Sequence, residues 1–534
     1  MSDSEAPVLI AGGGMVGLCA AAFLAQRGIR SIAIERLRAS SPLPRAAFFH
    51  MRTLELFRSL GIERAVRERS AEDFVPEGAI VAVDCLSGRK LADIMPSLNE
   101  GVEALSPCRR LYLNQPSLEP ILRACAREAG ATVLQGFELE SLRQDAHGVT
   151  VGVRDVDGGG RRELNGSYLI AADGAHSKVR ELLDIAYEGR GAFSNSLTIY
   201  FTADLSPWLA DKAWSIVYVN NPALGGFLRM NRTAQSGFLA INTVGDPKRD
   251  REAAANVSAD ATEPRLIALV RAAVGVADLP VRIDGFTRWR ATASVAQSFS
   301  KARVFISGDA AHLMPPNGGF GGNTGIHDAH NLAWKLAFVL KGVAGPSLLD
   351  SYEPERKPVA HFTVEQAFTR YVTRTAPWLR AAHAPEPLAP DFDIELGYLY
   401  GCGSRLHADP RETRALPGSR APHLWLERAG SQVSTLDLTG RYLLLAAAEG
   451  SAWIGHATRI APEFAALPVD GFCIGRELAD RGNRFPALYG ISSSGAALIR
   501  PDGFVAGRFE ARGLDDAARL RRALAASLAG EPLS

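Results

Sequence analysis

The chain has 534 residues, of which 47% are hydrophobic and 22% are charged, and its formal net charge is +1. This composition predicts a well-buried protein of about three domains, at ~150 residues per domain. The balanced charge and the lack of long basic runs exclude a typical nucleic-acid-binding protein, so we expect no nucleic-acid partner.

Cysteine usage and the N-terminal stretch bear on location. The six cysteines contain no C-x-x-C pair, which favours a reducing cytoplasm over a disulfide framework. The stretch from Val8 to Ala25 carries no charge, but acidic residues precede it and it contains four glycines, which are costly in a helix. We therefore expect a cytoplasmic protein with neither a signal peptide nor a stable membrane association.

The first predicted unit is a strand, a glycine turn, a helix and a second strand. It consists of an apolar strand over 8–10, a G-x-G-x-x-G turn at Gly12, Gly14 and Gly17, a helix over 18–27, and a strand over 31–34 followed by Glu35 and Arg36. Such a turn brings backbone close to a pyrophosphate at a helix N-terminus, and the terminal carboxylate binds ribose hydroxyls. The unit predicts a dinucleotide site and leaves NAD and FAD open.

Two later segments repeat the plan of strand, turn and helix. In "YLIAADGAHSKVRELLDI", the Asp173-Gly174 turn is followed by a helix that Ser177 opens and that carries Arg180. In "FISGDAAHLMPPNGGFGGNTGIHDAHNLAWKLA", a strand over 304–307 leads to Gly308-Asp309, a loop rich in proline and glycine, and a helix predicted over 324–340.

These three segments together resemble the class A flavoprotein monooxygenases, the para-hydroxybenzoate hydroxylase and phenol hydroxylase family, and within it the phenol and aromatic polyketide hydroxylases. The resemblance implies a permanently bound FAD and NAD(P)H as a transient co-substrate, since there is one dinucleotide fingerprint. The cofactor-binding residues that it implies are Gly12, Gly14, Gly17, Glu35, Arg36, Arg45, Gln115, Asp173, Asp309, Pro316, Gly322 and Asn323.

The resemblance also assigns roles within the proline–glycine loop. Asp309 is expected to bind the ribityl hydroxyls, and Pro316 to stiffen the backbone beside the flavin ring. The amides of Gly322 and Asn323, at the start of the helix, are expected to stabilise the negative charge of the reduced ring. The loop reads "PPNGGFGGN" where the family has a sequence closer to P-F-G-G-Q-G-x-N, so the surroundings of the ring edge differ from the family pattern.

Between residues 185 and 292 the pattern changes to successive antiparallel strands, with a helix at 263–274. The resemblance implies that this sheet, with parts of 75–115, roofs the substrate cavity. Its candidate lining residues are Tyr200, Trp214, Tyr218, Phe227, Arg229, Trp289 and Arg290. The candidate catalytic residues are His50, Tyr218 and Arg290.

Three histidines near the loop raise the question of a metal. His327 and His330 are spaced to share a helix face, and His312 precedes them. Because no HExxH motif or cysteine pair supports them, packing histidines are favoured and we expect no metal site.

The predicted fold is α/β, with a Rossmann-type FAD-binding domain, an inserted antiparallel-sheet substrate domain and a C-terminal thioredoxin-like domain. The boundaries are 1–184 and 293–370 for the FAD-binding domain, 185–292 for the substrate domain, 371–415 for a linker or crossover, and 416–534 for the C-terminal domain. The last resembles the C-terminal domain of the phenol hydroxylase branch. It lacks C-x-x-C, so we expect a structural or dimerising role and a possible homodimer.

The resemblance implies an FAD- and NAD(P)H-dependent monooxygenase that hydroxylates a phenolic or multi-ring aromatic substrate with O2 through a flavin C4a-hydroperoxide. Two alternatives stay open on the sequence. One is a Baeyer–Villiger or epoxidising monooxygenase on the same scaffold, and the other is a flavin-binding protein without turnover.

Overall fold

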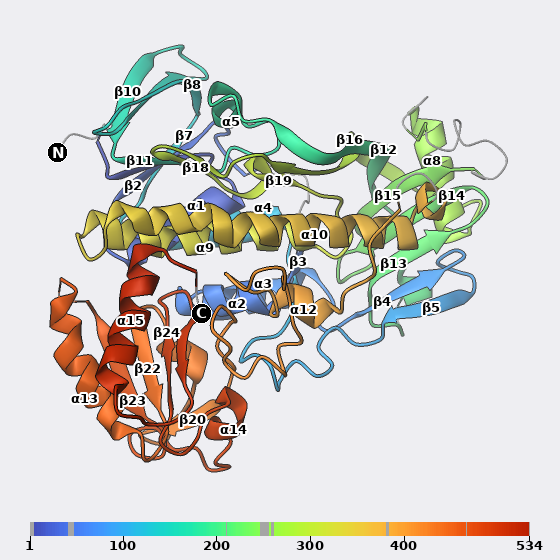
Figure 1. The fold of residues 1–534 in the computed structure, drawn as a ribbon. Coiled ribbons are helices and arrows are strands. Elements are labelled where there is room, and N and C mark those ends of the chain that lie inside the picture. The colour runs from blue at the N-terminus through green and yellow to red at the C-terminus, as the bar shows by residue number, and fades with distance from the viewer. Residues whose placement is uncertain are drawn as a thin grey trace.

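The computed structural model describes residues 5–40, 47–209, 211–245, 256–257, 261–380, 384–465 and 467–532. In Figure 1 a parallel sheet lies above the paired helices α9 (Phe320–Leu340) and α10 (Tyr352–Arg374), and a C-terminal unit lies beneath them. A long, mostly antiparallel sheet extends from above these helices to their right-hand end.

The parallel sheet has the strand order β17-β18-β11-β1-β2-β7. Its strands are β1 (Val8–Ala11), β2 (Ser31–Glu35), β7 (Thr132–Gln135), β11 (Tyr168–Ala171), β18 (Val304–Ile306) and the antiparallel edge strand β17 (Ser300–Lys301). The central strands are continuous apolar runs because both faces of the sheet are covered.

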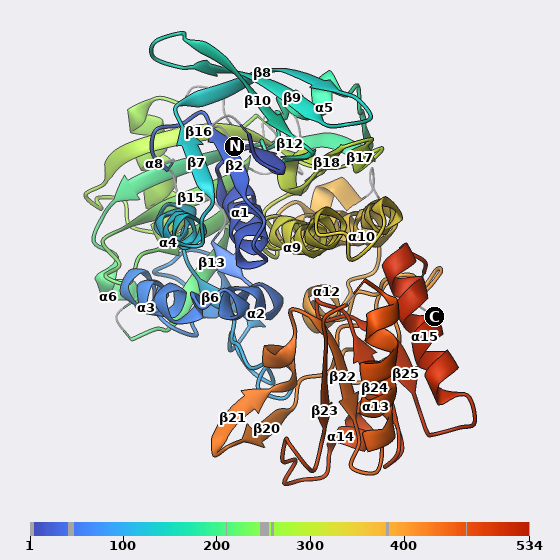
Figure 2. The same cartoon turned by 90° about the vertical axis from the view of Figure 1, so that its left-hand side faces the viewer.

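Helices cover one face of the parallel sheet and a small antiparallel sheet covers the other (Figure 2). The helices are α1 (Met15–Gln26), α4 (Gln115–Glu128) and α9, and the small sheet has strands β8 (Phe137–Gln144), β9 (Val149–Asp155) and β10 (Arg161–Gly166). The charge-free stretch from Val8 to Ala25 is therefore β1 and α1 of this core. Among the described residues, no helix is both long and apolar enough to span a membrane.

The long sheet has eight strands in the order β19-β16-β12-β15-β14-β13-β4-β5. They are β4 (Ala79–Val83), β5 (Lys90–Met95), β12 (Tyr187–Thr202), β13 (Trp214–Asn220), β14 (Leu224–Met230), β15 (Ser236–Val244), β16 (Arg282–Ala296) and β19 (His312–Leu313). Helix α8 (Glu263–Val274) packs on one face of it and buries Leu266 and Val270. Because β19 belongs to the segment that follows Gly308-Asp309, the sheet is tied directly to that loop.

The remaining elements of the body are short. They are β3 (Phe48–Phe49), β6 (Leu111–Tyr112), α2 (Met51–Ser59), α3 (Glu63–Asp73), α5 (Lys178–Leu182), α6 (Ser206–Leu209), α12 (Asp391–Glu395) and the 3-10 turns η1 (Gly308–Ala310), η2 (Pro346–Ser351) and η3 (Pro377–Leu379). The antiparallel pair β3–β6 brings Phe48 opposite Tyr112.

The C-terminal unit contains a four-stranded sheet in the order β23-β22-β24-β25. Its elements are the hairpin β20 (Trp425–Arg428) and β21 (Ser431–Ser434), η4 (Thr435–Leu438), β22 (Tyr442–Ala446), α13 (Ser451–Ile460), η5 (Ala461–Glu463), β23 (Val469–Cys473), α14 (Phe485–Tyr489), β24 (Ala496–Ile499), β25 (Val505–Phe509) and α15 (Asp516–Ala529). Strands β22 and β23 are parallel, and β24 and β25 are antiparallel to their neighbours.

A buried ionic network joins this unit to the body. The Glu355 carboxylate on α10 accepts from Lys335 Nζ at 2.8 Å and from both terminal nitrogens of Arg500, at 2.5 and 2.9 Å. Burial alone would raise the pKa of Glu355, but the attraction of Arg500 and Lys335 holds it below its usual value. Trp334 and Phe338 of α9 extend the contact, because they share one core with Tyr442 of β22.

Helix α9 begins at Phe320, four residues before the start that the sequence predicts. Gly319, in the left-handed region with φ +70°, turns the chain into the helix, and the buried Phe320 anchors its first turn. The prediction placed Gly321 and Gly322 in the loop because glycine is a poor helix former, and tertiary packing overrides that preference.

Candidate active site

The glycine turn after β1 is shaped by close backbone contacts. A Cβ on Gly12 would overlap the carbonyl oxygen of Ala172, and one on Gly17 would overlap the carbonyl oxygen of Gly12. Gly14 is the N-cap of α1, and no side chain of the described residues caps that helix. The amides of the first turn of α1 are therefore available to an anion.

Glu35 lies at the end of β2 beside this turn. Its carboxylate accepts from the amide of Gly13 at 2.8 Å and from that of Leu37 at 2.7 Å. These bonds fix the carboxylate next to the glycine turn. Arg36 points away, two-thirds exposed, and its nearest acid is Glu138 of β8 at 3.8 Å.

Gln115, the first residue of α4, is brought to the same turn through Glu119. Its Nε2 donates to Glu119 Oε1 at 2.6 Å, and a Cβ on Gly14 would lie 3.7 Å from that oxygen. Arg45 lies outside the described residues.

Asp173 presents one unsatisfied acceptor. Its Oδ2 accepts from the amide of Val179 at 3.0 Å, whereas the buried Oδ1 has no hydrogen-bond partner among the described residues. Burial raises the pKa of this carboxyl, and a hydrogen bond from Ser177 opposes the rise. A buried acceptor without a partner fits a site that receives hydroxyl or amide donors from a ligand.

Arg180 connects this turn to the Gly308-Asp309 turn. Its guanidinium lies 4.1 Å over the ring of Tyr187 and donates to the carbonyl of Ile185 at 2.7 Å. The Tyr187 hydroxyl donates in turn to the carbonyl of Asp309 at 2.9 Å. The two motifs therefore form one structural unit.

The Asp309 side chain lies over the first turn of α9. It is exposed, and a Cβ on Gly321 would lie 4.0 Å from its Oδ1. No side chain from the described part of the chain caps α9, so its first amides, which include Gly322, remain available. Pro316 is exposed beside them, while Gly322 is half-buried.

Asn323 acts through its side chain, a role that the sequence did not indicate. Its Oδ1 accepts from the amide of His50 at 3.0 Å and from Thr53 Oγ1 at 2.6 Å. Its Nδ2 donates to the carbonyls of Phe48 and Gly319, at 2.8 and 2.7 Å. One buried amide thus fixes the start of α9 against β3 and α2.

His50, a candidate catalytic residue, is buried behind the loop. Its Nε2 lies 2.9 Å from the carbonyl of Gly318, and burial lowers its pKa. Its ring packs edge-on against Phe48 and Phe320. These contacts position the loop.

Asp328 supports the Gly308-Asp309 turn from below, and sequence reasoning missed it. Its Oδ2 accepts from the amide of Gly308 at 3.2 Å and lies 2.9 Å from His312 Nε2, while Arg356 Nε donates to its Oδ1 at 2.7 Å. All three side chains are fully buried. The available signal was a lone acid in an otherwise apolar helix, which burial makes costly without partners.

His327 and His330 are buried and make packing contacts. His327 Nε2 lies 3.1 Å from Thr53 Oγ1, and the His330 ring packs edge-on against Phe23. Burial holds the pKa of both well below its usual value. Within the described residues, no group of three or more metal-ligating side chains is present.

The long sheet reaches the proline–glycine loop through Tyr218. Asn317 Nδ2 donates to the Tyr218 hydroxyl at 3.5 Å, and Tyr218 pairs across strands with Phe227. Tyr218, Phe227 and Arg229 face this side of the sheet together with Tyr112 and Phe48 from the β6–β3 pair. We call this set of packed side chains the aromatic chamber, and the name refers to these residues alone. Its residues are Phe48, Tyr112, Tyr218, Phe227 and Arg229.

Of the remaining candidates of the long sheet, Tyr200 lies on the same face beside the chamber, because the ring of its partner Phe238 is 5.9 Å from that of Phe227. Arg290 is exposed on β16. Its neighbour Trp289 donates from Nε1 to Thr198 Oγ1 at 3.0 Å. Tyr200 pairs with Phe238 on neighbouring strands, and Trp214 packs with the core of the α8 face.

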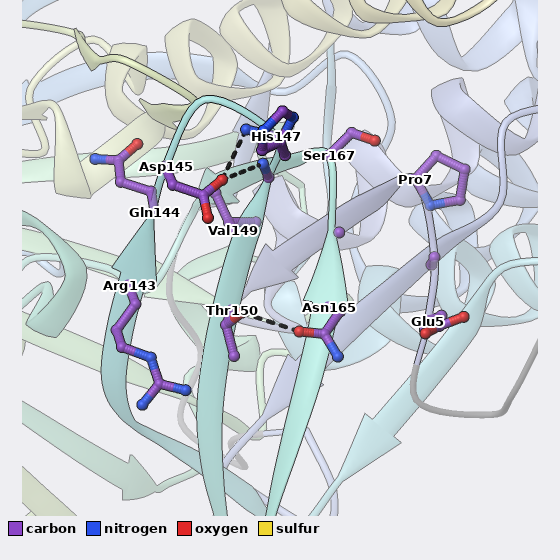
Figure 3. Close-up of a pocket in the computed structure, with 13 residues that line it drawn as sticks. Glu5, Pro7, Arg143, Gln144, Asp145, His147, Val149, Thr150, Asn165 and Ser167 are labelled. Carbon is purple, nitrogen blue, oxygen red and sulfur yellow. Dashed lines mark hydrogen bonds between the residues drawn. The ribbon is translucent and has the colours of Figure 1, made fainter.

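A separate surface depression of about 670 Å³ lies at the amino-terminal end of β1, beside the small sheet of β8, β9 and β10 (Figure 3). Pro7, Asp145, His147 and Asn165 are among the residues around it, and Pro7 precedes β1, whereas the glycine turn follows it. Ligands of parallel α/β sheets bind at the carboxyl ends of the strands, so this depression is not the dinucleotide site.

The residues present fit FAD. Two uncapped helix N-termini offer amides for negative charge, Glu35 and Asp309 offer carboxylates for sugar hydroxyls, and Asp173 offers a buried free acceptor.

Comparisons with known proteins agree with this geometry. Residues 5–367 match the model of the FAD binding domain, and residues 414–532 match that of the aromatic-ring hydroxylase C-terminal domain. A 4-methyl-5-nitrocatechol 5-monooxygenase of Burkholderia sp. is 46% identical, over 98% of both chains. A tetracenomycin A2 monooxygenase-dioxygenase of Streptomyces glaucescens is 36% identical, over 99% of this chain and 98% of its own.

The fold matches solved flavin-dependent hydroxylases. The structure of an aklavinone-11 hydroxylase with FAD and aklavinone superposes with a TM-score of 0.91 at 33% identity, and covers 99% of this chain and 100% of that one. The chain is a mixed α/β protein of the same architecture, and it belongs to the FAD-dependent aromatic-ring hydroxylases, the flavoprotein monooxygenases that its three motifs resemble.

Proposed function

We propose that this chain hydroxylates a substituted phenol or catechol, with NAD(P)H as a transient reductant and O2 as the source of the added oxygen. The observation that carries the proposal is the contact between Tyr218 of the long sheet and Asn317 of the proline–glycine loop. It sets the aromatic chamber against the segment that would hold the reactive end of FAD.

The chain's own residues would hold the cofactor along its length. The first-turn amides of α1 would bind the pyrophosphate, and Glu35 the adenosine ribose. Asp309 would accept from the ribityl hydroxyls, and the first amides of α9 would face the negative edge of the reduced ring. Bound FAD supplies the activation of O2 for transfer of one oxygen atom to an electron-rich ring.

The protein's part in the reaction is placement and exclusion of water. The chamber consists mainly of packed aromatic side chains, and the rings of Phe48 and Tyr112 stack with their centroids 5.0 Å apart. His50 and Asn323 hold the loop against β3 and so position the ring-binding backbone. Arg290 is exposed on β16, and its catalytic role stays a prediction from the sequence.

The relative that is 46% identical supports a small acidic catechol as the substrate. If oxygen enters at a ring carbon that carries a nitro group, the nitro group leaves as nitrite and the ring becomes a hydroxyquinone. One NAD(P)H and one O2 are consumed, and one water is formed. A multi-ring aromatic is the second candidate, because the matching structure holds aklavinone.

The test is NAD(P)H consumption by the FAD-loaded protein with 4-methyl-5-nitrocatechol, 4-methylcatechol and an anthraquinone phenol. We expect the nitrocatechol to accelerate consumption with one nitrite per NAD(P)H. Acceleration by the anthraquinone alone would favour the multi-ring substrate. If none of these compounds, nor a wider panel of phenols, accelerates consumption, the proposed hydroxylation is wrong.

We also propose that the chain divides at the boundaries that the sequence predicts and that the C-terminal unit is thioredoxin-like. The order β23-β22-β24-β25, with one parallel and two antiparallel pairings and with α13 and α15 packed together, supports this. Cys473 is a free thiol whose pKa burial raises, which supports a structural role. Homodimer formation stays a prediction that light scattering tests.

A further inference from the structure

We propose that Arg229 binds the ionised phenol oxygen of an acidic aromatic substrate and thereby selects for substrates that carry a negative charge on the ring. The inference rests on the proposed function, because it concerns the same chamber, and it goes beyond it by naming the charge state and the residue that recognises it.

Arg229 is buried, and no described residue forms an ion pair with it. It is 3% exposed, and its Nε, Nη1 and Nη2 have no hydrogen-bond partner among the described residues. Other buried arginines of this protein differ, since Arg356, Arg420 and Arg500 each donate to a carboxylate. A buried charge without a partner is costly, so a guanidinium with three free nitrogens points to a ligand that supplies the acceptor.

The surroundings keep this guanidinium charged but do not satisfy its donors. It lies 4.0 Å over the ring of Phe74 and 5.0 Å from that of Tyr112, contacts that favour a cation but accept no N–H. Burial lowers its pKa to about 10, so it stays protonated at neutral pH. Asp73, the acid whose charge acts on Arg229, already accepts from Ser117 Oγ at 2.6 Å and pairs with Arg69 at 3.0 Å.

Two independent routes place Arg229 in the chamber beside the loop. The first route runs along the sheet. Arg229 lies two residues from Phe227 on β14, so the two side chains share one face of the sheet. Phe227 is opposite Tyr218, and Tyr218 contacts Asn317 of the loop. The second route runs through aromatic rings. Arg229 contacts the ring of Tyr112, which stacks on Phe48. Phe48 in turn lies against Gly319 of the loop, where an added Cβ would be 2.9 Å from the Cβ of Phe48. Figure 1 shows β13 and β14 on the right, in the part of the long sheet that also contains β4 and β5.

The charged groups around the chamber favour an anion. The positive charges of Arg374 and Arg110, like that of Arg229, act to lower the pKa of Tyr112. Arg110 is also paired with Glu395 at 2.9 Å. The Tyr112 hydroxyl, which has no partner among the described residues, can donate to the same oxygen. A bound phenol that meets a desolvated guanidinium loses its proton more readily, and the ionised ring is the more electron-rich one that hydroxylation requires.

The experiment measures binding to the oxidised FAD-loaded protein without NAD(P)H, with 4-nitrocatechol as the acidic probe and catechol as its neutral counterpart. Difference absorbance spectra report both the dissociation constant and the ionisation state of bound 4-nitrocatechol. The variants are Arg229→Met and Arg229→Lys. The control is Arg282→Met, an exposed arginine of the same sheet. FAD content and Tm establish that each variant is folded.

We expect wild type and Arg282→Met to bind 4-nitrocatechol as its ionised form, with a pKa below that of the free compound. Arg229→Met should weaken the binding of 4-nitrocatechol at least tenfold and that of catechol less than threefold. Arg229→Lys should bind 4-nitrocatechol with an intermediate affinity. Equal losses for the two probes, or no loss, would overturn the inference. If Arg229→Met does not fold, the wild-type spectrum decides, since an unchanged or raised pKa of bound 4-nitrocatechol contradicts the role of Arg229.

Failure of the inference is distinguishable from failure of the proposed function. Turnover of catechols by a wild type that shows no preference for the ionised probe would overturn the inference alone. A wild type that binds neither probe would overturn both the inference and the catechol substrate class.

Discussion

The Tyr187 hydroxyl donates to the backbone carbonyl of Asp309 across 122 residues of sequence, at 2.9 Å. Because Arg180 covers the Tyr187 ring at 4.1 Å, one tyrosine links the second motif to the third motif and its proline–glycine loop. Burial raises the pKa of this hydroxyl to about 12, so it is a donor at all physiological pH values.

We predict that Tyr187→Phe weakens FAD binding about fivefold, because one neutral hydrogen bond contributes ~1 kcal/mol to the position of the loop. Titration of the apoprotein with FAD, followed by fluorescence quenching, measures this. Tyr200→Phe, on the same strand, is the matched control, since no hydrogen bond joins its hydroxyl to the described residues. An unchanged FAD affinity in Tyr187→Phe would show that the loop is held without this bond.

Asp309→Ala should weaken FAD binding more than Tyr187→Phe does, because the Asp309 carboxylate is expected to accept hydrogen bonds from cofactor hydroxyls directly. A charged hydrogen bond of this kind contributes ~1.5–3 kcal/mol, so FAD affinity should fall tenfold or more while the fold stays intact. The same titration applies, with circular dichroism to check folding and the exposed Asp211→Ala as control. If Asp309→Ala binds FAD as tightly as wild type, Asp309 does not bind the cofactor.

The motifs could be predicted from the sequence because each is local. Gly12, Gly14 and Gly17 follow a strand and open a helix within a few residues. Strand alternation, in contrast, does not single out Tyr218 among the seven lining candidates. The family resemblance is confirmed by matches that cover both ends of the chain.

Tertiary contacts could not be predicted from the sequence. Asn323 bonds His50, 273 residues away, and Asp328 supports Gly308 from within a helix that reads as core. Among the described residues Arg229 has no carboxylate partner, whereas Arg500 has two. This difference depends on how distant strands pack, which residue spacing does not reveal.

The buried ionic junction predicts a strong effect of Glu355→Gln on stability. Removing the charge leaves Arg500 and Lys335 buried with a weaker acceptor, which should cost ~3 kcal/mol or more and lower Tm. Thermal unfolding at fixed FAD concentration measures it. Glu463→Gln, in the exposed pair with Arg521, is the control and should leave Tm unchanged. Equal Tm values for Glu355→Gln and wild type would show that the junction contributes little.

Acid should destabilise the protein through its buried histidines. Burial lowers the pKa of His423 to about 4, below the ordinary value of 6.5. The unfolded chain then binds more protons than the folded one between pH 4 and 6.5, so stability is lost as pH falls through this window. The loss from one such group is ~2 kcal/mol. Melting curves at pH 7 and pH 5 should differ less in His423→Gln than in wild type, and identical pH dependence of Tm in the two would contradict this assignment.

Cys473→Ser should leave hydroxylation unchanged, because the thiol is buried, its Sγ lies 3.3 Å from the carbonyl of Ala447, and its raised pKa disfavours a thiolate. Steady-state product formation at saturating substrate is the measurement. A loss of about tenfold, ~1.4 kcal/mol in the barrier, with FAD content and Tm unchanged would show that the thiol takes part in the chemistry.

If this chain uses FAD to place one atom of O2 on an aromatic ring, the product must carry that atom. The most direct measurement is turnover of a phenol or catechol under ¹⁸O2 with NAD(P)H, followed by mass spectrometry of the product. We expect a yellow protein that releases FAD on denaturation, substrate-dependent NAD(P)H oxidation, and a product that carries one ¹⁸O atom. NAD(P)H oxidation that yields no ¹⁸O-labelled product from any phenol would contradict it.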